Sequence, residues 1–370
     1  YFCAMRRVWI LAALLAGCGD ETTLLRIVDF DGERYVLNDV PRGELASFDP
    51  VSGPSGLSLA EASIRFTTQG FPQDGGGDRD RLVEGAREAR ARIRKDGEVA
   101  VAQDLDSLAL LTGYVLFARA AEHYESIGVV MPDEPVALHY NPEFINGALL
   151  GLPSSDNAAY LPEIDAFAVL PTVALEGIPL AMNPGVVIHE FAHRVFYYVA
   201  FDRELFAALE RRTGTPGLGQ AFNRVRAVEE GVADFFAASF TGDPRFLAAS
   251  VPGTGIGEER DLEPLRDFPV AWLDGSEPTR NGSFDPYGVG VLFASTLWAM
   301  AEEFGHDSIR DALLLGLRAL PPQLATFDFQ IGDLMGLVID ALQSNQRDAA
   351  CDIVFERYQA AFPRVANRCP

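Results

Sequence analysis

The chain has 370 residues and a formal net charge of −23 at pH 7, with 30 basic side chains against 53 acidic ones. Nucleic-acid binding as the main activity is excluded, because contacts to phosphates require clustered basic residues. Hydrophobic residues make up 48% of the chain, so it is neither disordered nor a small disulfide scaffold. The same acidity opposes adsorption to anionic lipid, so contact with a bilayer requires another route.

Residues 5–18, MRRVWILAALLAGC, combine a basic start, a short apolar stretch and a cysteine. The apolar stretch is too short for a permanent membrane span and is typical of a secretory signal. Its end resembles the bacterial lipobox, which implies that residues 1–17 are a leader and lipoprotein signal and that Cys18 carries the lipid. An ordinary signal peptide with a chance cysteine is the alternative. We expect an exported lipoprotein of the cell envelope, and Gly19 after the cysteine favours the outer membrane over the inner one.

The region 18–130 has an uncertain role and begins with short stretches typical of strands. Residues 70–80, GFPQDGGGDRD, favour a loop. Calcium accepts carboxylate ligands, but the spacing and the final Glu of an EF-hand are missing, so we prefer a solvated loop to a Ca²⁺ site. The aspartates concerned are Asp74, Asp78 and Asp80.

Apolar residues at intervals of three and four predict helices after this loop. We expect a charged helix at 81–95 and a more apolar one at 103–127. Strands are predicted at 136–140 and 167–170, and the chain is mostly helical from 184 onward. The organisation is therefore α+β, with a sheet-containing lobe followed by a helical one.

The segment His189-Glu190-Phe191-Ala192-His193 follows residues that begin a helix, because Asn183 and Pro184 supply an N-cap and a proline of the first turn. Histidines four apart share one face of a helix and can bind one metal ion. Glu190 lies about 100° round the helix, where its carboxylate can take a proton from metal-bound water. Two core histidines satisfied by the backbone are the alternative.

A third ligand is expected from a second helix at about 219–240, which carries Glu230 and Asp234 on one face. Glu230 can bind the metal while Asp234 accepts the other ring N–H of a ligating histidine. Glu229 is the second choice of ligand. A solvated acidic face is the alternative, but the neighbouring apolar residues mark a buried helix.

HEFAH followed by EEGVADFFA resembles the gluzincin zinc peptidases, closest to the fungalysin branch of the thermolysin-like fold. The resemblance implies a zinc ion held by His189, His193 and Glu230, with Glu190 as general base and Asp234 orienting His189. It also implies a two-lobed α+β metallopeptidase domain at 131–370. Its mixed-sheet lobe with the zinc helix would span 131–200 and its mainly helical lobe 201–370.

Two further segments extend the resemblance. Asn157 and Ala158 match the edge strand on which thermolysin-like enzymes pair the substrate backbone, with a plain Asx turn as the alternative. Tyr287 stands where the fungalysin branch carries the histidine that donates to the oxyanion, and aminopeptidases of the clan use a tyrosine there. A core tyrosine is the alternative, and His306 is the second choice of donor.

The sequence therefore favours a zinc-dependent peptidase that cleaves peptides or proteins with water activated at zinc. An endopeptidase is preferred, with an aminopeptidase as the alternative. An envelope lipoprotein with a purely structural zinc site is the second hypothesis. In an oxidising envelope Cys351 and Cys369 could form a disulfide, with two unpaired thiols as the alternative. The oligomeric state is left open by the sequence.

Overall fold

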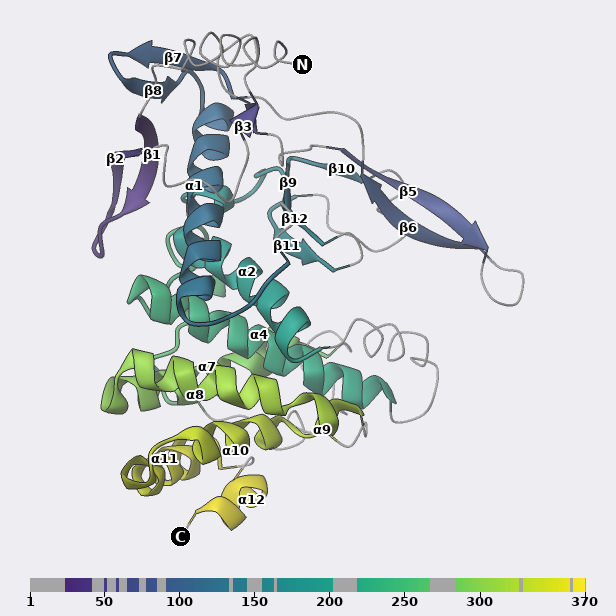
Figure 1. The fold of residues 1–370 in the computed structure, drawn as a ribbon, viewed down its shortest axis with the longest axis vertical. Helices are drawn as coiled ribbons and strands as arrows, with labels where there is room; N and C mark the ends of the chain where they lie inside the picture. The colour runs from purple at the N-terminus through teal and green to yellow at the C-terminus, as the bar shows by residue number, and fades with distance from the viewer. Residues whose placement is uncertain are drawn as a thin grey trace, which may run out of the picture.

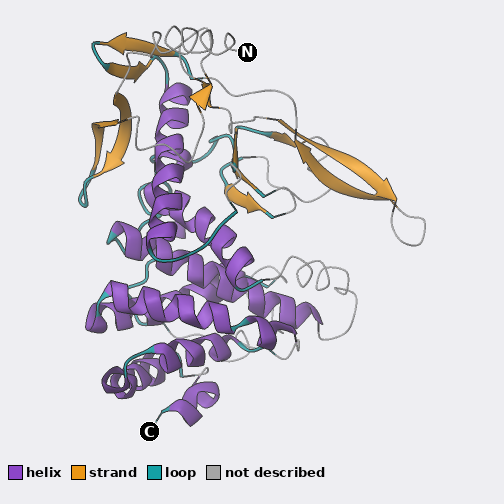
Figure 2. Ribbon diagram, in the orientation of Figure 1, coloured by secondary structure: helices purple, strands orange, loops and turns teal. Residues whose placement is uncertain are grey.

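The structure is a computed structural model that describes residues 24–41, 50–51, 58–59, 65–72, 78–84, 91–132, 136–144, 155–162, 165–201, 218–266, 284–325, 329–359 and 362–369. The leader, Cys18 and Asp74 lie outside the described residues, and so do the predictions made for them. The described chain is a mixed α+β protein, with small sheets toward one end and stacked helices toward the C-terminus (Figures 1 and 2). Among these residues, no helix is long and apolar enough to cross a membrane.

The strands form four small sheets, of order β2-β1-β8-β7, β10-β5-β6, β11-β12-β9 and β3-β4. Their bounds are β1 Leu24–Phe30, β2 Tyr35–Pro41, β3 Pro50–Val51, β4 Ser58–Leu59, β5 Arg65–Pro72, β6 Asp78–Glu84, β7 Ile93–Asp96, β8 Val99–Ala102, β9 Ala137–Tyr140, β10 Glu143–Phe144, β11 Ala158–Leu161 and β12 Ala166–Val169. The strands predicted at 136–140 and 167–170 are thus confirmed as β9 and β12.

The charged helix predicted at 81–95 is wrong. The start of this segment belongs to β6, which pairs antiparallel with β5 from Phe66↔Glu84 to Pro72↔Asp78. The end belongs to the β7–β8 hairpin, whose turn at Gly97 has φ +63°, a conformation that glycine adopts without strain. Pairing with a distant strand and a turn therefore override an apolar spacing that also fits a helix. Of the loop predicted at 70–80, residues 70–72 belong to β5 and residues 78–80 to β6, which carries Asp78 and Asp80.

The helices include the two that carry the predicted metal ligands. Their bounds are α1 Leu105–Ser126, η3 Leu180–Met182, α2 Pro184–Val199, α4 Leu218–Thr241, α5 Ile256–Glu259, α7 Pro286–Phe304, α8 His306–Ala319, α9 Pro321–Ala325, α10 Ile331–Ala341, α11 Ser344–Arg357, α12 Phe362–Val365 and η4 Ala366–Arg368. The apolar helix predicted at 103–127 is confirmed as α1. The predicted start of α2 is also confirmed, because the side chain of Asn183 accepts the backbone N–H groups of Gly185 and Val186.

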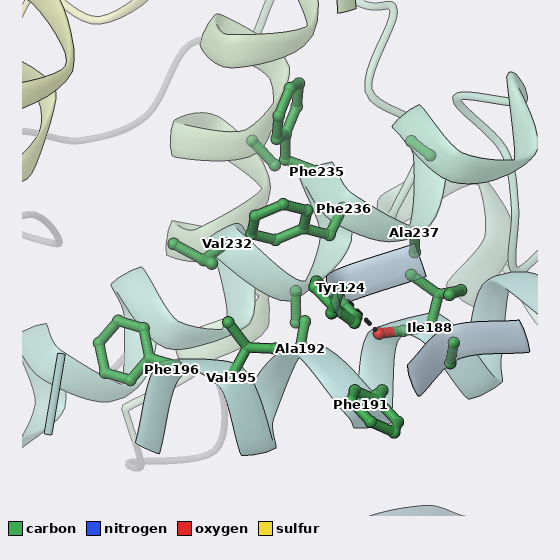
Figure 3. Close-up of a cluster of buried hydrophobic side chains, with 14 of the residues drawn as sticks. Tyr124, Ile188, Phe191, Ala192, Val195, Phe196, Val232, Phe235, Phe236 and Ala237 are labelled. Carbon is green, nitrogen blue, oxygen red and sulfur yellow. Dashed lines mark hydrogen bonds between the residues drawn. The ribbon is translucent and has the colours of Figure 1, made fainter. Parts of the chain in front are cut away.

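The centre of the core lies where α1, α2 and α4 meet (Figure 3). Tyr124 of α1 is fully buried, stacks on Phe191 with ring centroids 5.3 Å apart, and meets Phe236 of α4 edge-on. Its hydroxyl donates to the carbonyl oxygen of Ile188 at 3.4 Å. Helix α1 lies before the expected peptidase domain at 131–370, yet it packs directly against α2 and helps to fix that helix in place.

Helices α4 and α7 cross at two glycines. A Cβ atom added to Gly231 would lie 2.5 Å from the carbonyl oxygen of Gly290, and one added to Gly290 would lie 2.7 Å from that of Ala227. Such distances are shorter than a real Cβ atom tolerates, so the two backbones touch only because both positions lack a side chain. This contact holds the helix turn that carries Glu230 against the first turns of α7.

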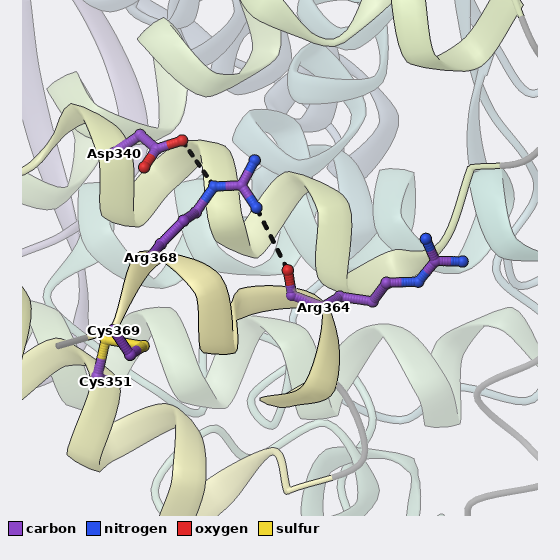
Figure 4. The surroundings of a disulfide bond; sticks show 5 residues. All are labelled: Asp340, Cys351, Arg364, Arg368 and Cys369. Atoms are coloured by element: carbon purple, nitrogen blue, oxygen red, sulfur yellow. Dashed lines mark hydrogen bonds and ion pairs between the residues drawn. A yellow bond between two sulfur atoms is a disulfide. The ribbon is translucent and has the colours of Figure 1, made fainter.

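At the C-terminus, Cys351 of α11 forms a disulfide with Cys369, 18 residues further along the chain (Figure 4). The pair predicted from the sequence is therefore formed. Closing a loop of this size stabilises the fold by roughly 3 kcal/mol through the lost entropy of the unfolded chain. Arg368 adds an ion pair with Asp340 of α10 at 2.6 Å, so the terminal segment is fastened to two helices.

Candidate metal centre

Three side chains from α2 and α4 bring their ligand atoms to one point. His189 Nε2 lies 3.1 Å from His193 Nε2 and 3.3 Å from Glu230 Oε2, and His193 Nε2 lies 3.7 Å from the same carboxylate oxygen. Tetrahedral zinc, with bonds of about 2.0–2.1 Å, places its ligand atoms roughly 3.3 Å apart. The group of two histidines and one glutamate therefore has the spacing that a single ion requires.

The protonation pattern of the histidines also calls for a cation. Each Nδ1 faces a carboxylate, Asp234 for His189 and Glu229 for His193, both at 3.0 Å. Assigning the ring proton to Nδ1 leaves a lone pair on each Nε2, and these lone pairs face one another. Glu230 Oε2 adds a third, since it is buried without a hydrogen-bond partner among the described residues. Converging lone pairs repel, so these residues fit a bound metal ion.

The pKa values of His193 and Glu230 show how strongly these buried groups act on one another. Burial alone lowers the pKa of His193, but the carboxylates of Glu230 and Glu229 outweigh it and raise that pKa to about 10. Burial alone raises the pKa of Glu230, but His193 and His189 outweigh it and lower that pKa to about 2. A positive charge among these groups is therefore favoured, and it is either a proton on the His193 ring or a bound cation that takes the place of that proton.

Two charged residues that support the ligands were not assigned this role from the sequence. Glu229 was named only as a second choice of ligand, yet its carboxylate is the partner of His193 Nδ1. Arg260 forms an ion pair with Asp234, whose side chain is fully buried, through both its Nε and Nη2 atoms. The doubled glutamate could have indicated the first, but Arg260 lies 26 residues beyond Asp234, directly after the short helix α5, where the sequence carries no motif.

Glu190 faces the edge strand β11. Strand β11 pairs on one side with β12 and has no strand on its other side in the described sheet. The carbonyl of Asn157 accepts the N–H of Leu170, which directly follows β12. Because backbone groups alternate in direction along a strand, the N–H and C=O groups of Ala158 and Tyr160 point away from β12. There the N–H of Tyr160 donates to Glu190 Oε2 at 3.0 Å. The free edge of β11 and Glu190, the expected base, thus lie side by side in the same cleft.

A partly buried ion pair fastens β11 to α2. Asp165 accepts two hydrogen bonds from the Arg194 guanidinium, at 2.9 and 3.0 Å. The same carboxylate accepts the hydroxyls of Tyr160 and Tyr198, both at 2.8 Å. Because Arg194 directly follows His193, this network links the edge strand to the helix turn that carries a candidate ligand. Sequence reasoning did not single out any of these residues.

The neighbouring Asp156 organises the rim of the cleft. It has a positive φ of 55°, and its Oδ1 accepts the backbone N–H groups of Val173, Ala174 and Leu175 at 2.8–3.2 Å. These bonds lower the pKa of Asp156 to about 2. The carboxylate that accepts backbone N–H groups in a turn here is thus Asp156, and Asn157 lies directly before β11.

The ligands lie at the bottom of a cleft of about 860 Å³, which is also lined by Asn157, Ala158, Glu190 and Tyr287. Tyr287 follows Pro286 at the start of α7 and is 40% exposed. Its ring lies beneath the Arg260 guanidinium, 4.8 Å from ring centroid to Cζ. His306 does not line the cleft; it begins α8 and contacts Glu302 and Trp298. The structure therefore places Tyr287 beside the ligands and leaves His306 away from them.

Neither the scan of protein-family models nor the search of curated proteins finds a match to this chain.

Proposed function

We propose that this protein is a zinc-dependent peptidase of the thermolysin-like type, with a sheet lobe and a helical lobe on either side of the cleft. One observation carries the proposal: the lone pairs of His189, His193 and Glu230 converge beside a buried carboxylate, Glu190, that faces a free strand edge. A zinc ion at that point would polarise a peptide carbonyl and make water more acidic. A purely structural site requires neither Glu190 nor an open strand edge.

The residues of the chain divide the work of hydrolysis. The outward-facing backbone groups of Ala158, assisted by Asn157, pair with an extended peptide. Glu190 accepts the proton of the attacking water and returns it to the departing amine; burial raises the pKa of its carboxyl group, which suits a base near neutral pH. Tyr287 donates a hydrogen bond to the carbonyl oxygen as negative charge develops on it.

We further propose that the enzyme is an endopeptidase carried on an exported lipoprotein, anchored in the envelope through an acylated Cys18. The disulfide between Cys351 and Cys369 supports an oxidising location, because such bonds persist mainly outside the cytosol. A cleft open along a strand edge favours cleavage within a chain over removal of one terminal residue.

The proposal is tested by metal analysis together with cleavage of a peptide library. We expect about one zinc per chain, cleavage of extended peptides, loss of cleavage after chelation, and recovery when zinc is added back. Stoichiometric zinc with no cleavage of any peptide or unfolded protein would establish the structural-zinc alternative. Cleavage confined to N-terminal residues would establish an aminopeptidase.

Replacing Tyr287 with Phe removes only the phenolic hydroxyl. We expect kcat to fall by roughly 10², because one donor to the oxyanion is lost, while the zinc content stays the same. Steady-state kinetics and metal analysis of the purified variant measure both quantities. His306→Gln is the matched control and should keep the rate of the unmodified protein, since His306 lies outside the cleft. A Tyr287→Phe variant with full activity would remove the tyrosine from the mechanism.

A further inference from the structure

Arg226 lies in the cleft on the helix face that carries a proposed metal ligand. It stands four residues before Glu230 in α4, so the two side chains share a face. Its side chain is exposed and lines the cleft with Glu230 and Tyr287. The pKa of Tyr287 is raised chiefly by the charge of Glu230 and by burial, and Arg226 is one of the cations that oppose this rise. The guanidinium therefore lies near the reacting end of the cleft.

The charge of Arg226 is not used within the described part of the chain. Its guanidinium lies against the ring of Phe222, and it makes no ion pair or hydrogen bond with the residues that the structure describes. The two carboxylates nearest to it on α4 have other partners. Glu229 Oε1 faces His193 Nδ1 at 3.0 Å, and Glu230 Oε2 faces the two Nε2 atoms. The positive charge is thus available to a molecule in the cleft.

The contact with Phe222 limits how the guanidinium can turn. The Arg226 Cζ atom lies 6.0 Å from the centroid of that ring, within the range of a cation–π interaction. The guanidinium carries its N–H donors as a planar fork. Such a fork matches the two oxygens of a carboxylate better than any neutral group.

The distance along α4 indicates which part of a substrate would meet Arg226. Side chains one helical turn apart have Cβ atoms about 5–6 Å apart. An extended peptide advances about 3.3 Å per residue, so this separation corresponds to roughly two residues. A substrate group facing Arg226 therefore lies close to the bond that is cleaved.

We propose that Arg226 binds a carboxylate of the substrate within about two residues of the cleaved bond. The enzyme would accordingly prefer peptides with Asp or Glu at one such position, or peptides whose free C-terminus lies there. This inference depends on the proposed peptidase function and adds the substrate class to it. An arginine in a largely acidic chain selects acidic substrates only by direct contact, because the net charge of −23 repels them at long range.

The test uses pairs of peptides that differ by Glu against Gln at single positions around a known cleavage site, all with amidated C-termini. For the unmodified protein we expect kcat/KM to be about five- to tenfold higher for Glu at one position, between the effect of an exposed ion pair and that of a buried one. Adding salt should reduce the ratio. Neutral peptides with a free or an amidated C-terminus show whether a terminal carboxylate is the group that is bound.

In Arg226→Gln, the ratio of kcat/KM for the Glu peptide to that for the Gln peptide should fall close to one. In Arg226→Glu the same ratio should fall below one. Arg94→Gln on β7, which removes the same charge from an exposed strand outside the cleft, should keep the original ratio. The same pairs can be compared by Kd in the Glu190→Gln chain, so slow cleavage does not hide a difference in binding. Equal rates and equal Kd values for every pair, or a ratio that survives in Arg226→Gln, would overturn the proposal. Absence of cleavage of every peptide would instead contradict the proposed function.

Discussion

Replacing Glu190 with Gln is expected to lower kcat for peptide cleavage by about 10³ or more while the zinc content stays at one ion per chain. General base catalysis contributes roughly 10²–10⁴, and an amide cannot accept the proton of the attacking water. Zinc should be retained because His189, His193 and Glu230 are unchanged. The Gln side chain has the same size, and its carbonyl oxygen can still accept the N–H of Tyr160, so the fold should not suffer.

The measurement combines initial rates on one cleaved peptide with metal analysis and thermal unfolding of the same sample. Glu302→Gln is a suitable control, since Glu302 is an exposed residue of α7 that pairs with His306 outside the cleft. It should leave rate, zinc content and melting temperature unchanged. A Glu190→Gln protein that still cleaves at more than a tenth of the normal rate would remove Glu190 as the base.

Replacing Asp234 with Ala should both destabilise the protein and weaken zinc binding. The carboxylate is fully buried between His189 Nδ1 and the Arg260 guanidinium. Removing it leaves a buried cation without its partner, which costs about 3–5 kcal/mol in the free energy of unfolding. Because His189 also loses the acceptor that fixes its ring, we expect zinc affinity to fall about 10- to 100-fold. Urea unfolding of the metal-free protein and competition with a chelator measure the two effects.

A double variant separates these two effects. Asp234→Leu together with Arg260→Met replaces the ion pair by apolar side chains, so much of the lost stability should return. Zinc affinity should remain low, because His189 Nδ1 still has no acceptor. If affinity recovered together with stability, the role of Asp234 would be to hold the fold rather than to orient the ligand. A single Asp234→Ala variant as stable as the unmodified protein would contradict the buried ion pair itself.

Local patterns were sufficient to predict the elements that carry the candidate ligands. Asn183 and Pro184 begin a helix by N-capping and by a fixed φ, and both act through neighbours in sequence. The four-residue spacing of His189 and His193 likewise follows from helix geometry alone. The close approach of Glu230 depends on packing between helices. The sequence named Glu230 as a candidate because a third ligand was needed and its helix is apolar, and the resemblance to a known family named the same residue.

The features that were missed depend on contacts between distant segments. Segment 81–95 was predicted as a helix because its apolar residues recur at intervals of three and four, whereas β5 pairs with its beginning and the turn at Gly97 folds back its end. Arg260 reaches Asp234 from a segment without regular spacing. The Asp165–Arg194 ion pair joins a loop to a helix 29 residues later. No local pattern encodes such pairings, because they exist only once the chain is folded.

The crossing of α4 and α7 has a consequence for how this protein can change in evolution. Gly231 directly follows Glu230, and Gly290 lies one turn after Tyr287, so the contact between the two glycines sets the spacing of a ligand and an expected donor. A methyl group at Gly290 would meet the backbone of α4, which cannot be moved aside as a flexible side chain can. Two residues without any functional group thus limit which sequences can keep the candidate site intact.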